Sequence, residues 1–429
     1  MAFRTYTGGK MKGMSISQHP QPSVMIVCDY SLSYLGGAQI ALVRQARALA
    51  DAGWRVTVVA PDATQTFRED RPMNLATRDP KVLFTLPGLD LPMLPSRGRL
   101  TRALTKLGKQ QHVDGIIVHS EFALAAAALE TAQALGVPLL HTVHTYFWDA
   151  PKALAPVAPV VTAFHRTLTG LPGKQKFRGS TTINNALRSM THRLATEADA
   201  VLSPSRHQAD ALRIAGVENV HVLSNVVQPL IDEPKPAAGA PGHEHAPDEP
   251  HLRLVWAGRF APEKRIEVAL EAIRLARAGL ESAGAGSNAI HLDIAGGHGE
   301  IEAGVTYHGR LASDEVGELI SRADAVVLTS LGFDNQPMIA LEACARKRPV
   351  IVSDPVLARE FGDAAISAAG DGTESGDAAA LANVLIGLAI DRGTLDAAGE
   401  AAEAYARDRQ GTAHAAGIAA ILQAGCRAA

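Results

Sequence analysis

The sequence has few cysteines and no long run of apolar residues. Cys28, Cys344 and Cys426 are the only cysteines among 429 residues, and their scattered positions suit neither a zinc site nor a disulfide framework. A reducing compartment is therefore expected, and with it a cytoplasmic location. No segment reaches the roughly 20 apolar residues that a membrane-spanning helix needs. Any association with a membrane is expected to be peripheral, at its inner face.

The chain also lacks an excess of charge of either sign. It carries 41 Lys and Arg against 44 Asp and Glu, a formal net charge of -3 at pH 7. Nucleic-acid binding usually needs a positive excess, so nucleic acid is not an expected partner. The G-x-G-x-x-G pattern is also missing from the first half, which argues against a nicotinamide or flavin enzyme.

Short apolar runs alternate with longer segments of helical periodicity along most of the chain. This alternation is typical of βαβ units, whose right-handed crossovers build a parallel sheet with helices on both faces. The expected strands are residues 24–30, 56–60, 115–118, 139–143 and 200–203 in the first half, and 252–257, 291–295, 325–329 and 349–352 in the second.

A chain of this length is too long for one compact core, so two domains are expected. The fold class is α/β, with two Rossmann-like, doubly wound domains facing each other across a cleft. The predicted organisation is a disordered tail (1–20), a first domain (21–228), a linker (229–251), a second domain (252–390) and terminal helices (391–429), the last of which can cross back to the first domain.

The predicted linker is rich in Pro, Gly, Ala, Glu and His and has no periodicity. Its histidines, His243, His245 and His251, have no neighbours that would complete a coordination sphere. A solvated loop is therefore expected there, and no metal site is expected anywhere in the chain.

Two cations follow the first strand of the second domain. The segment from Val255 to Arg265 ends a strand near Gly258 and opens a helix, which places Arg259 and Lys264 at the junction. A helix amino end favours anions, and two cations beside it suit a diphosphate that gains charge as its bond to a sugar breaks. From this segment alone, two ordinary surface cations on a solvated loop are an equally good interpretation.

Two carboxylates flank the start of a later helix. Asp334 and Asn335 precede Pro337 and are placed to cap the helix, while Glu342 lies about one and a half turns inside it. This spacing lets both acids serve one ligand, whose ribose and hexose hydroxyls need acceptors. The alternative is a helix cap with a solvated glutamate, but the apolar neighbours of Glu342 argue against it.

Together these segments resemble the donor pocket of retaining glycosyltransferase family 4, which has the GT-B fold. The resemblance implies that Arg259 and Lys264 hold the diphosphate, Glu342 the ribose and Asp334 the donor sugar, with Asn335 among the donor-binding residues. In the family the first acid is usually Glu, whereas Asp334 is one methylene shorter. Gln336 and Pro337 stand where Phe and Gly are commoner.

Two features of the first domain extend this resemblance. Gly36 and Gly37 precede a predicted helix, where bare amides can approach a phosphate or sugar, although a turn needed only for geometry explains them as well. His144 follows the strand 139–143 and shares a face with Thr142. The family places a functional histidine there, near the donor sugar, which makes His144 the candidate in preference to His141.

Cations are concentrated in one stretch of the first domain. Between Asp149 and Glu197 there is no Asp or Glu. The stretch contains Lys152, Arg166, Lys174, Lys176, Arg178, Arg188 and Arg193. An anionic acceptor or an anionic membrane would fit this charge, and a solvated loop with ordinary helix-face charges is the alternative.

These features predict a retaining transferase that moves a hexose-type sugar from a nucleotide diphosphate to a glycan or lipid-linked acceptor, without metal or other cofactor. His144, Arg259, Lys264 and Asp334 are the expected catalytic residues, and no nucleophilic carboxylate is evident. Two alternatives remain open on the same scaffold: a sugar-nucleotide epimerase or hydrolase, and a non-catalytic subunit that binds nucleotide sugars.

Overall fold

The computed structural model describes residues 21–33, 36–86, 90–147, 150–172, 180–227, 252–284 and 289–427. The predicted tail (1–20) and linker (229–251), with its three histidines, lie outside these residues. The chain divides into two compact units, one formed by Met1–Ser224 with Gly411–Ala429 and the other by Asn225–Gln410. The predicted terminal segment 391–429 is thus shared between the two units rather than forming one piece.

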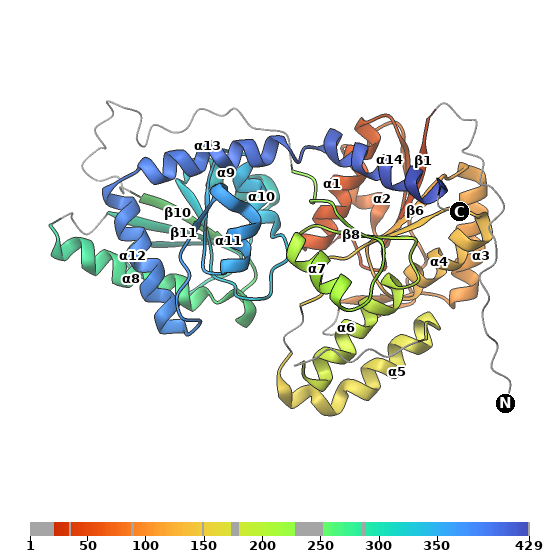
Figure 1. The fold of residues 1–429 in the computed structure, drawn as a ribbon, viewed down its shortest axis with the longest axis horizontal. Helices are drawn as coiled ribbons and strands as arrows, with labels where there is room; N and C mark the ends of the chain where they lie inside the picture. Colours follow the sequence, from red (N-terminus) through yellow and green to blue (C-terminus); the bar gives the residue numbers. More distant parts are fainter. Residues whose placement is uncertain are drawn as a thin grey trace. The chain divides into compact units, whose positions relative to one another are not determined.

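The first unit contains a seven-stranded parallel sheet in the order β3-β2-β1-β6-β7-β8-β9, and a small antiparallel pair, β4-β5 (Figure 1). Its strands are β1 (Ser23–Val27), β2 (Arg55–Val59), β3 (Leu75–Arg78), β4 (Phe84–Leu86), β5 (Leu91–Met93), β6 (Gly115–Val118), β7 (Leu139–Thr142), β8 (Ala200–Ser203) and β9 (Val220–Val222). Its helices are α1 (Gly37–Asp51), α2 (Ala63–Thr66), α3 (Arg97–Gln111), α4 (Ala123–Leu135), η1 (Lys152–Val157), α5 (Ala158–Thr169), α6 (Thr182–Ala195), α7 (Arg206–Ile214) and α14 (Gly411–Arg427).

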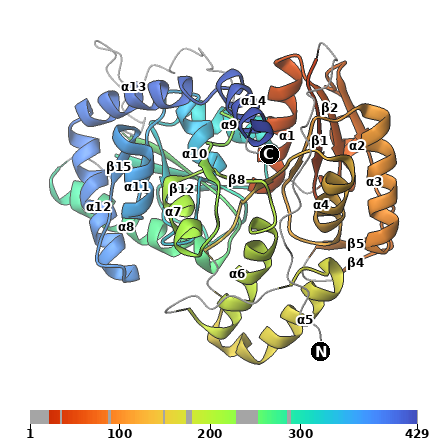
Figure 2. The same cartoon turned by 45° about the vertical axis from the view of Figure 1, so that its right-hand side comes forward.

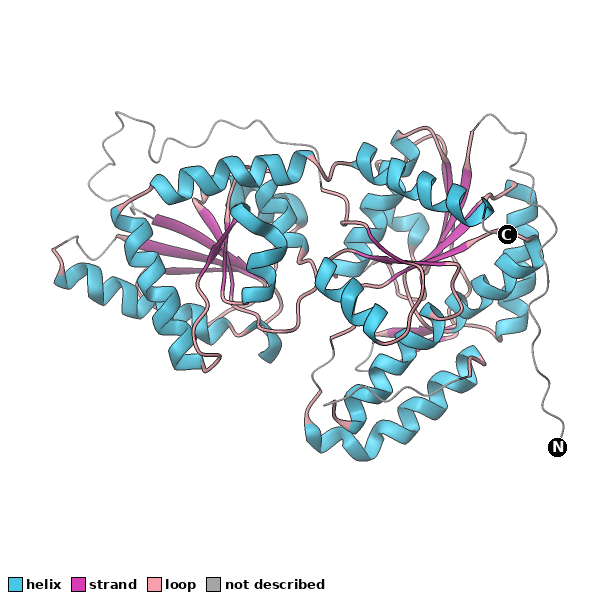
Figure 3. Ribbon diagram, viewed as in Figure 1, coloured by secondary structure: helices cyan, strands magenta, loops and turns pink. Residues whose placement is uncertain are grey.

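The second unit contains a six-stranded parallel sheet in the order β12-β11-β10-β13-β14-β15. Its strands are β10 (Leu252–Ala257), β11 (Ile290–Ala295), β12 (Val305–Gly309), β13 (Ala325–Leu328), β14 (Val350–Val352) and β15 (Ala365–Ser367). Its helices are η2 (Pro262–Lys264), α8 (Ile266–Ser282), α9 (Ser313–Arg322), α10 (Met338–Cys344), α11 (Pro355–Phe361), η3 (Gly362–Ala364), α12 (Glu374–Ile390) and α13 (Gly393–Arg407). Each sheet lies between helices, as Figure 3 shows in magenta and cyan.

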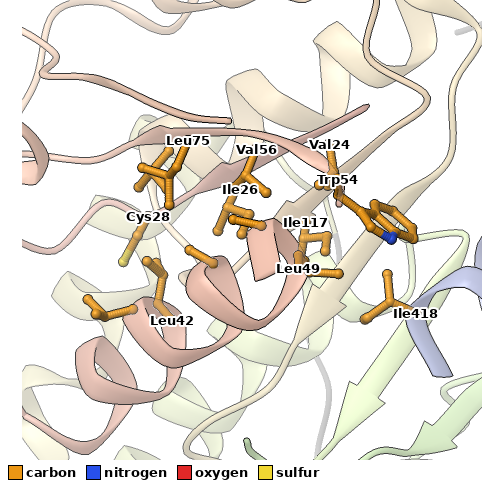
Figure 4. Close-up of a cluster of buried hydrophobic side chains, with 14 of the residues drawn as sticks. Val24, Ile26, Cys28, Leu42, Leu49, Trp54, Val56, Leu75, Ile117 and Ile418 are labelled. Atoms are coloured by element: carbon orange, nitrogen blue, oxygen red, sulfur yellow. The ribbon is translucent and has the colours of Figure 1, made fainter. Parts of the chain in front are cut away.

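Helix α14 completes the core of the first unit although it follows the second unit in the chain. Ile418 and Leu422 belong to the same buried cluster as Leu49 of α1 and Trp54 (Figure 4). Close packing of α14 on the sheet also explains Gly115 in β6, because a β-carbon there would lie 2.7 Å from Leu422 Cδ2.

In each sheet there is one switch point, where the strand order reverses and successive strands are added on the opposite side. In the first sheet this point lies between β1 and β6, and in the second between β10 and β13. Open α/β sheets bind ligands at the carboxyl ends of the two strands that flank such a point. A ligand site is therefore expected at the residues that follow β6, β10 and β13.

Two elements differ from the sequence prediction near these strand ends. Strand β1 ends at Val27, before the predicted Tyr30. The reason lies in Asp29, whose carboxylate accepts hydrogen bonds from the Ser120 hydroxyl and from the amides of Leu124 and Ala125 at the start of α4. Helix α8 begins at Ile266, later than predicted, because η2 and the left-handed Arg265 (φ 50°) come before it.

Among the described residues, no single helix has both the length and the apolar composition needed to cross a membrane. One helix pair, α12 with α13, meets these two criteria jointly but bends by 100° between its members.

Candidate active site

Lys264 and Asp334 form an ion pair at the switch point of the second sheet. Nζ of Lys264 lies 2.6 Å from Oδ1 of Asp334, and the two side chains are 22% and 9% exposed. Lys264 ends η2, after β10, and Asp334 lies in the loop after β13. The two residues that the sequence predicted for the diphosphate and the sugar thus lie in direct contact.

The loops that carry this pair are tied together beneath it. The Thr329 hydroxyl donates to the carbonyl of Lys264 at 2.8 Å, and the indole N–H of Trp256 donates to the same hydroxyl at 3.1 Å. Trp256 and Thr329 are both nearly inaccessible to water. Because Trp256 lies in β10 and Thr329 follows β13, these bonds hold Lys264 in a fixed place relative to the loop of Asp334.

Asp334 has a second donor within its own loop. The Ser330 hydroxyl donates to Oδ2 of Asp334, so both carboxylate oxygens accept a hydrogen bond. The ring of Phe333 lies 5.5 Å from Nζ of Lys264, in cation–π geometry. Asp334 and Asn335 were predicted to cap the next helix, but α10 starts at Met338 with Pro337 in the cap position and no side-chain cap bond. That prediction was wrong because Lys264 and Ser330 engage the Asp334 carboxylate.

Arg259 is separate from this pair. Its guanidinium lies 3.2 Å from Oε1 of Glu263, and the Arg259 side chain is 64% exposed. No described contact joins Arg259 to Lys264 or Asp334. An exposed arginine paired with one surface carboxylate is free to reorient at small cost, so the Arg259 guanidinium can leave Glu263 to pair with an anion.

Glu342 and Asn335 are both buried, at 7% exposure each. Glu342 lies in α10, whose neighbouring residues Leu341 and Ala343 are fully buried. The structure therefore rules out a solvated glutamate on an outer helix face. Gln336, which the sequence analysis did not assign to the site, anchors the loop: its side-chain oxygen accepts from the amide of Asn225 at 2.8 Å, and its nitrogen donates to the hydroxyl of Tyr405 at 3.2 Å.

A glycine turn closes the neighbouring strand end. Gly296, which directly follows β11, has φ of 124°. A β-carbon at this position would lie 1.9 Å from the carbonyl oxygen of Gly258. Only glycine lets the ends of β11 and β10 approach so closely, which shapes the backbone beside Arg259.

In the first unit, His144 belongs to a chain of hydrogen-bonded side chains. Its Nε2 lies 2.8 Å from Nδ1 of His119, and Nε2 of His119 lies 2.8 Å from Oε1 of Gln45. Nε2 of Gln45 lies 2.8 Å from Nε2 of His414, whose Nδ1 lies 2.9 Å from the carbonyl oxygen of Ser224. Only His144 was identified from the sequence, because the other residues are far apart in the chain: His119 follows β6, Gln45 lies in α1 and His414 lies in α14.

Burial keeps the imidazole rings of His144, His119 and His414 neutral. Removal from water lowers the pKa of His144 to about 4 and that of His414 to about 4. Burial, reinforced by the neighbouring histidines, also lowers the pKa of His119 well below its ordinary value. At neutral pH each ring therefore carries one proton and offers one nitrogen as an acceptor.

His141 and Glu121 form a second buried contact nearby. Nε2 of His141 lies 3.9 Å from Oε1 of Glu121, and His141 is fully buried. Burial lowers the pKa of His141 to about 3 and raises the pKa of Glu121 to about 8. Both groups are thus uncharged at neutral pH. This assigns His141 to the packed interior of β7, whereas His144, two residues beyond the end of that strand, is partly exposed.

Gly36 and Gly37 stand at the amino end of α1. Gly36 is the cap residue, with φ of -81° and ψ of 176°, and Gly37 is the first helical residue and exposed. Neither needs the left-handed conformation. Their value for a ligand would be the absence of a side chain at a helix amino end, as the sequence analysis expected.

Across the described part of the chain, no group of three or more His, Cys, Asp and Glu side chains is arranged to hold a metal ion. Cys28 and Cys344 are buried and unbridged.

Comparison with known families covers most of the chain. The model of Glycosyltransferase Family 4 matches residues 35–229, and the model of Glycosyl transferases group 1 matches residues 251–391. No curated protein sequence matches the chain.

Solved structures share the two-domain GT-B fold. Anabaena HepE, solved in complex with UDP and glucose, is 15% identical with a TM-score of 0.62, over 94% of this chain and 99% of HepE. Sucrose-phosphate synthase of Thermosynechococcus elongatus is 17% identical with a TM-score of 0.61, over 95% and 100%. A putative UDP-N-acetylglucosamine 2-epimerase of Listeria monocytogenes is 13% identical with a TM-score of 0.56, over 95% and 98%.

Proposed function

Because the chain belongs to the glycosyltransferases of the family 4 type and has the GT-B fold, we propose that it moves a hexose-type sugar from a nucleotide diphosphate to an acceptor, with retention of configuration. The acceptor class is a glycan, a glycolipid or a lipid-linked intermediate of cell-envelope polysaccharide synthesis. The observation that carries the proposal is the Lys264–Asp334 pair at the switch point of the second sheet.

Lys264 supplies the charge that the leaving diphosphate needs. A half-buried ammonium held by fixed loops requires little rearrangement when the bond between sugar and phosphate breaks, and it stabilises the new negative charge at once. Arg259 adds a second cation that can swing onto the phosphates. UDP is the nucleotide in the Anabaena HepE structure, which makes a uridine donor the first to test.

Asp334 serves the sugar end of the donor and Glu342 serves the nucleotide end. Asp334 lies beside the cation that holds the diphosphate, so a hexose attached to that diphosphate is within its neighbourhood. Glu342 is buried in α10 and takes the ribose hydroxyls. His144 serves the donor sugar as a neutral hydrogen-bonding partner.

The bond changes are those of a transfer on one face of the sugar. The bond from the anomeric carbon to the phosphate oxygen breaks, and a bond to the acceptor oxygen forms. The proton of the acceptor hydroxyl passes to a phosphate oxygen of the departing nucleotide. The protein needs no nucleophile in this scheme, and the cations of Arg259 and Lys264 take the place of a metal ion.

A basic and partly apolar surface of the first unit supports a lipid-linked acceptor. Leu154, Val157 and Val160 of η1 and α5 are exposed, next to Lys152. Helix α5 packs against α6 (Figure 2). Exposed apolar side chains beside cations favour an anionic membrane face, where such an acceptor would be presented.

The test is a thermal-shift screen of nucleotide sugars followed by an assay of transfer. A ligand at 100 times its Kd stabilises the native state by about 2.7 kcal/mol, a readily measured shift. The expected result is stabilisation by one nucleotide sugar and transfer to an acceptor with the anomeric configuration kept. The epimerase fold likeness makes release of an epimer or a free sugar without acceptor the outcome that would replace this proposal. Binding without turnover would instead indicate a non-catalytic subunit.

A further inference from the structure

We propose that His119, Gln45 and His414 form a buried relay that fixes the tautomer of His144, leaving Nδ1 of His144 as the acceptor atom that the ring offers to a ligand. His119, Gln45 and His414 are positioning residues in this proposal. It rests on the proposed function only for the role of His144 towards the donor sugar. The relay itself is a property of the first unit, and it can be tested without any substrate.

The direction of the relay is set at its far end. The carbonyl oxygen of Ser224 can only accept a hydrogen bond, so Nδ1 of His414, 2.9 Å away, must carry the proton. Because the ring of His414 is neutral, its Nε2 is then an acceptor. The side-chain amide of Gln45 donates to that atom over 2.8 Å.

The same amide transmits this direction to the second pair of rings. With its nitrogen turned to His414, Gln45 presents its oxygen to His119, whose Nε2 must donate over 2.8 Å. The neutral ring of His119 is left with Nδ1 as an acceptor. Nε2 of His144 donates to it, again over 2.8 Å, so the remaining nitrogen of His144, Nδ1, has no proton.

The opposite orientation of the Gln45 amide is disfavoured by charge. Its oxygen would then face Nε2 of His414 while the Ser224 carbonyl faces Nδ1, so His414 would need a proton on both nitrogens. His414 is only 6% exposed, and burial opposes such a charge. Oxygen towards His119 is the orientation that keeps every ring neutral and every hydrogen bond made.

Because the relay residues are buried, the loss of any one of their hydrogen bonds is costly. His119, Gln45 and His414 are 3%, 2% and 6% exposed. Water therefore has little access to replace a lost partner, and an unpaired polar group in such a place costs roughly 1–3 kcal/mol. A wrong tautomer at any one ring leaves two acceptors or two donors facing each other. The Ser224 carbonyl, which can only accept, therefore determines the tautomer of all three histidines.

The relay has a chemical consequence at His144. A ring whose Nδ1 is an acceptor receives a hydrogen bond from a sugar hydroxyl and does not donate one. Among the described residues, no protein group is hydrogen-bonded to Nδ1 of His144. Helix α14 thus contributes to the candidate site through His414 without reaching the ligand.

The experiment reads the tautomers directly by NMR of protein labelled with ¹⁵N-histidine, at pH 7.5 and without substrate. Single His→Gln variants assign the rings. The expected result is a proton on Nε2 of His144 and His119 and on Nδ1 of His414. A proton on Nδ1 of His144 in the unsubstituted protein would overturn the relay.

Two substitutions at Gln45 distinguish an effect of its hydrogen bonds on the tautomers from an effect of its side-chain packing. Gln45→Leu removes both hydrogen bonds, so His144 should become a mixture of tautomers. Gln45→Glu keeps an acceptor for His119 and should leave the tautomer of His144 unchanged, while His414 gains a second proton. An unchanged His144 in Gln45→Leu, or equal effects of the two variants, would contradict the proposal.

Kinetics give a second, separate readout. Gln45→Leu should lower kcat by about threefold to tenfold, the scale of one misplaced hydrogen bond, with a smaller effect in Gln45→Glu. If no transfer is detected with any donor but the tautomers are as expected, the proposed function fails and the relay stands. If transfer is normal and the tautomer of His144 does not respond to Gln45→Leu, the relay alone fails.

Discussion

Nζ of Lys264 lies 2.6 Å from Oδ1 of Asp334, so the cation expected to hold the diphosphate is already paired with the carboxylate expected to meet the sugar. Both side chains are largely withdrawn from water, which makes their attraction stronger than that of a surface pair. A bound donor must therefore compete with Asp334 for Lys264. The nucleotide end and the sugar end of the candidate site are electrostatically coupled.

Loss of the Lys264 charge should reduce catalysis far more than folding. We expect Lys264→Ala to lower kcat by roughly 10²–10³-fold, as for removal of one group that stabilises the leaving charge. The control is Arg274→Ala in α8, an exposed cation paired with Glu271 and Glu302. Steady-state kinetics and melting temperatures check this, and near-normal transfer by Lys264→Ala would reject its assignment.

The pairing gives Asp334→Asn two opposite effects. Without the carboxylate, the charge of Lys264 is no longer neutralised, so UDP alone should bind about threefold to tenfold more tightly. Transfer should nevertheless slow, because the sugar loses its acceptor. Calorimetric titration with UDP and transfer rates measure the two effects. Weaker binding of UDP by Asp334→Asn would show that Asp334 does not restrain Lys264.

Substitution of the buried His141 should raise the stability of the protein at pH 5 relative to pH 7. Burial lowers its folded-state pKa to about 3, below the unfolded value of about 6.5. Its neutral form therefore stabilises the fold fully above pH 6.5, and this contribution is lost as the pH falls towards 3. Between pH 7 and pH 5 the loss is on the order of 2 kcal/mol.

His141→Leu removes that loss at similar volume. Urea unfolding at both pH values should show the variant gaining on the unsubstituted protein by on the order of 2 kcal/mol at pH 5 relative to pH 7. Glu121, whose pKa is raised to about 8 by burial, titrates in both proteins. Its contribution to the pH dependence of the unfolding free energy therefore largely cancels in the comparison. The same difference at both pH values would mean that His141 is charged or solvated in the fold.

The apolar surface of η1 and α5 predicts dependence on lipid charge. The protein should float with vesicles that contain anionic lipid and not with neutral ones, and Val160→Asp should weaken flotation several-fold. Ile214→Asp is the matched control, because Ile214 is also exposed but lies on α7. Equal binding to neutral and anionic vesicles, or equal effects of the two variants, would reject this surface.

Chelation tests the role given to the cations. If Arg259 and Lys264 neutralise the leaving diphosphate, transfer should continue in excess EDTA at nearly the rate without it. Restored Mg²⁺ should add less than about twofold. Abolition of transfer by EDTA, with recovery on adding metal, would assign the charge stabilisation to a metal ion instead.

The sequence predicted the fold, and it placed Lys264 and Asp334 after strands, because both depend on local patterns. Lys264 and Asp334 each follow a strand that flanks the switch point, so their proximity is a consequence of topology. Their direct ion pair was not predictable, since it depends on the path of two loops. The edge strands of both sheets, β3, β9, β12 and β15, were missed because they are short and only partly apolar.

The hydrogen-bonded contacts of Gln45 could not be predicted from the sequence for a different reason. Gln45 and His414 are separated by 369 positions, and no local pattern marks a glutamine in α1 as the partner of a histidine in α14. Their contact depends on α14 packing against α1, a tertiary event. By contrast, His144 could be proposed from the sequence, because it follows a strand end at which the family resemblance implies a functional histidine.

The return of α14 to the first unit sets an order of events during protein synthesis. The ribosome makes Met1–Ser224 well before Gly411–Arg427, with the entire second unit in between. Until α14 is made, the surface of α1 that receives Ile418 and Leu422 is open to water, and Gln45 has no His414 to meet. The nascent first unit therefore remains incomplete throughout translation of the second, and a message truncated before codon 411 should yield a protein that chaperones retain.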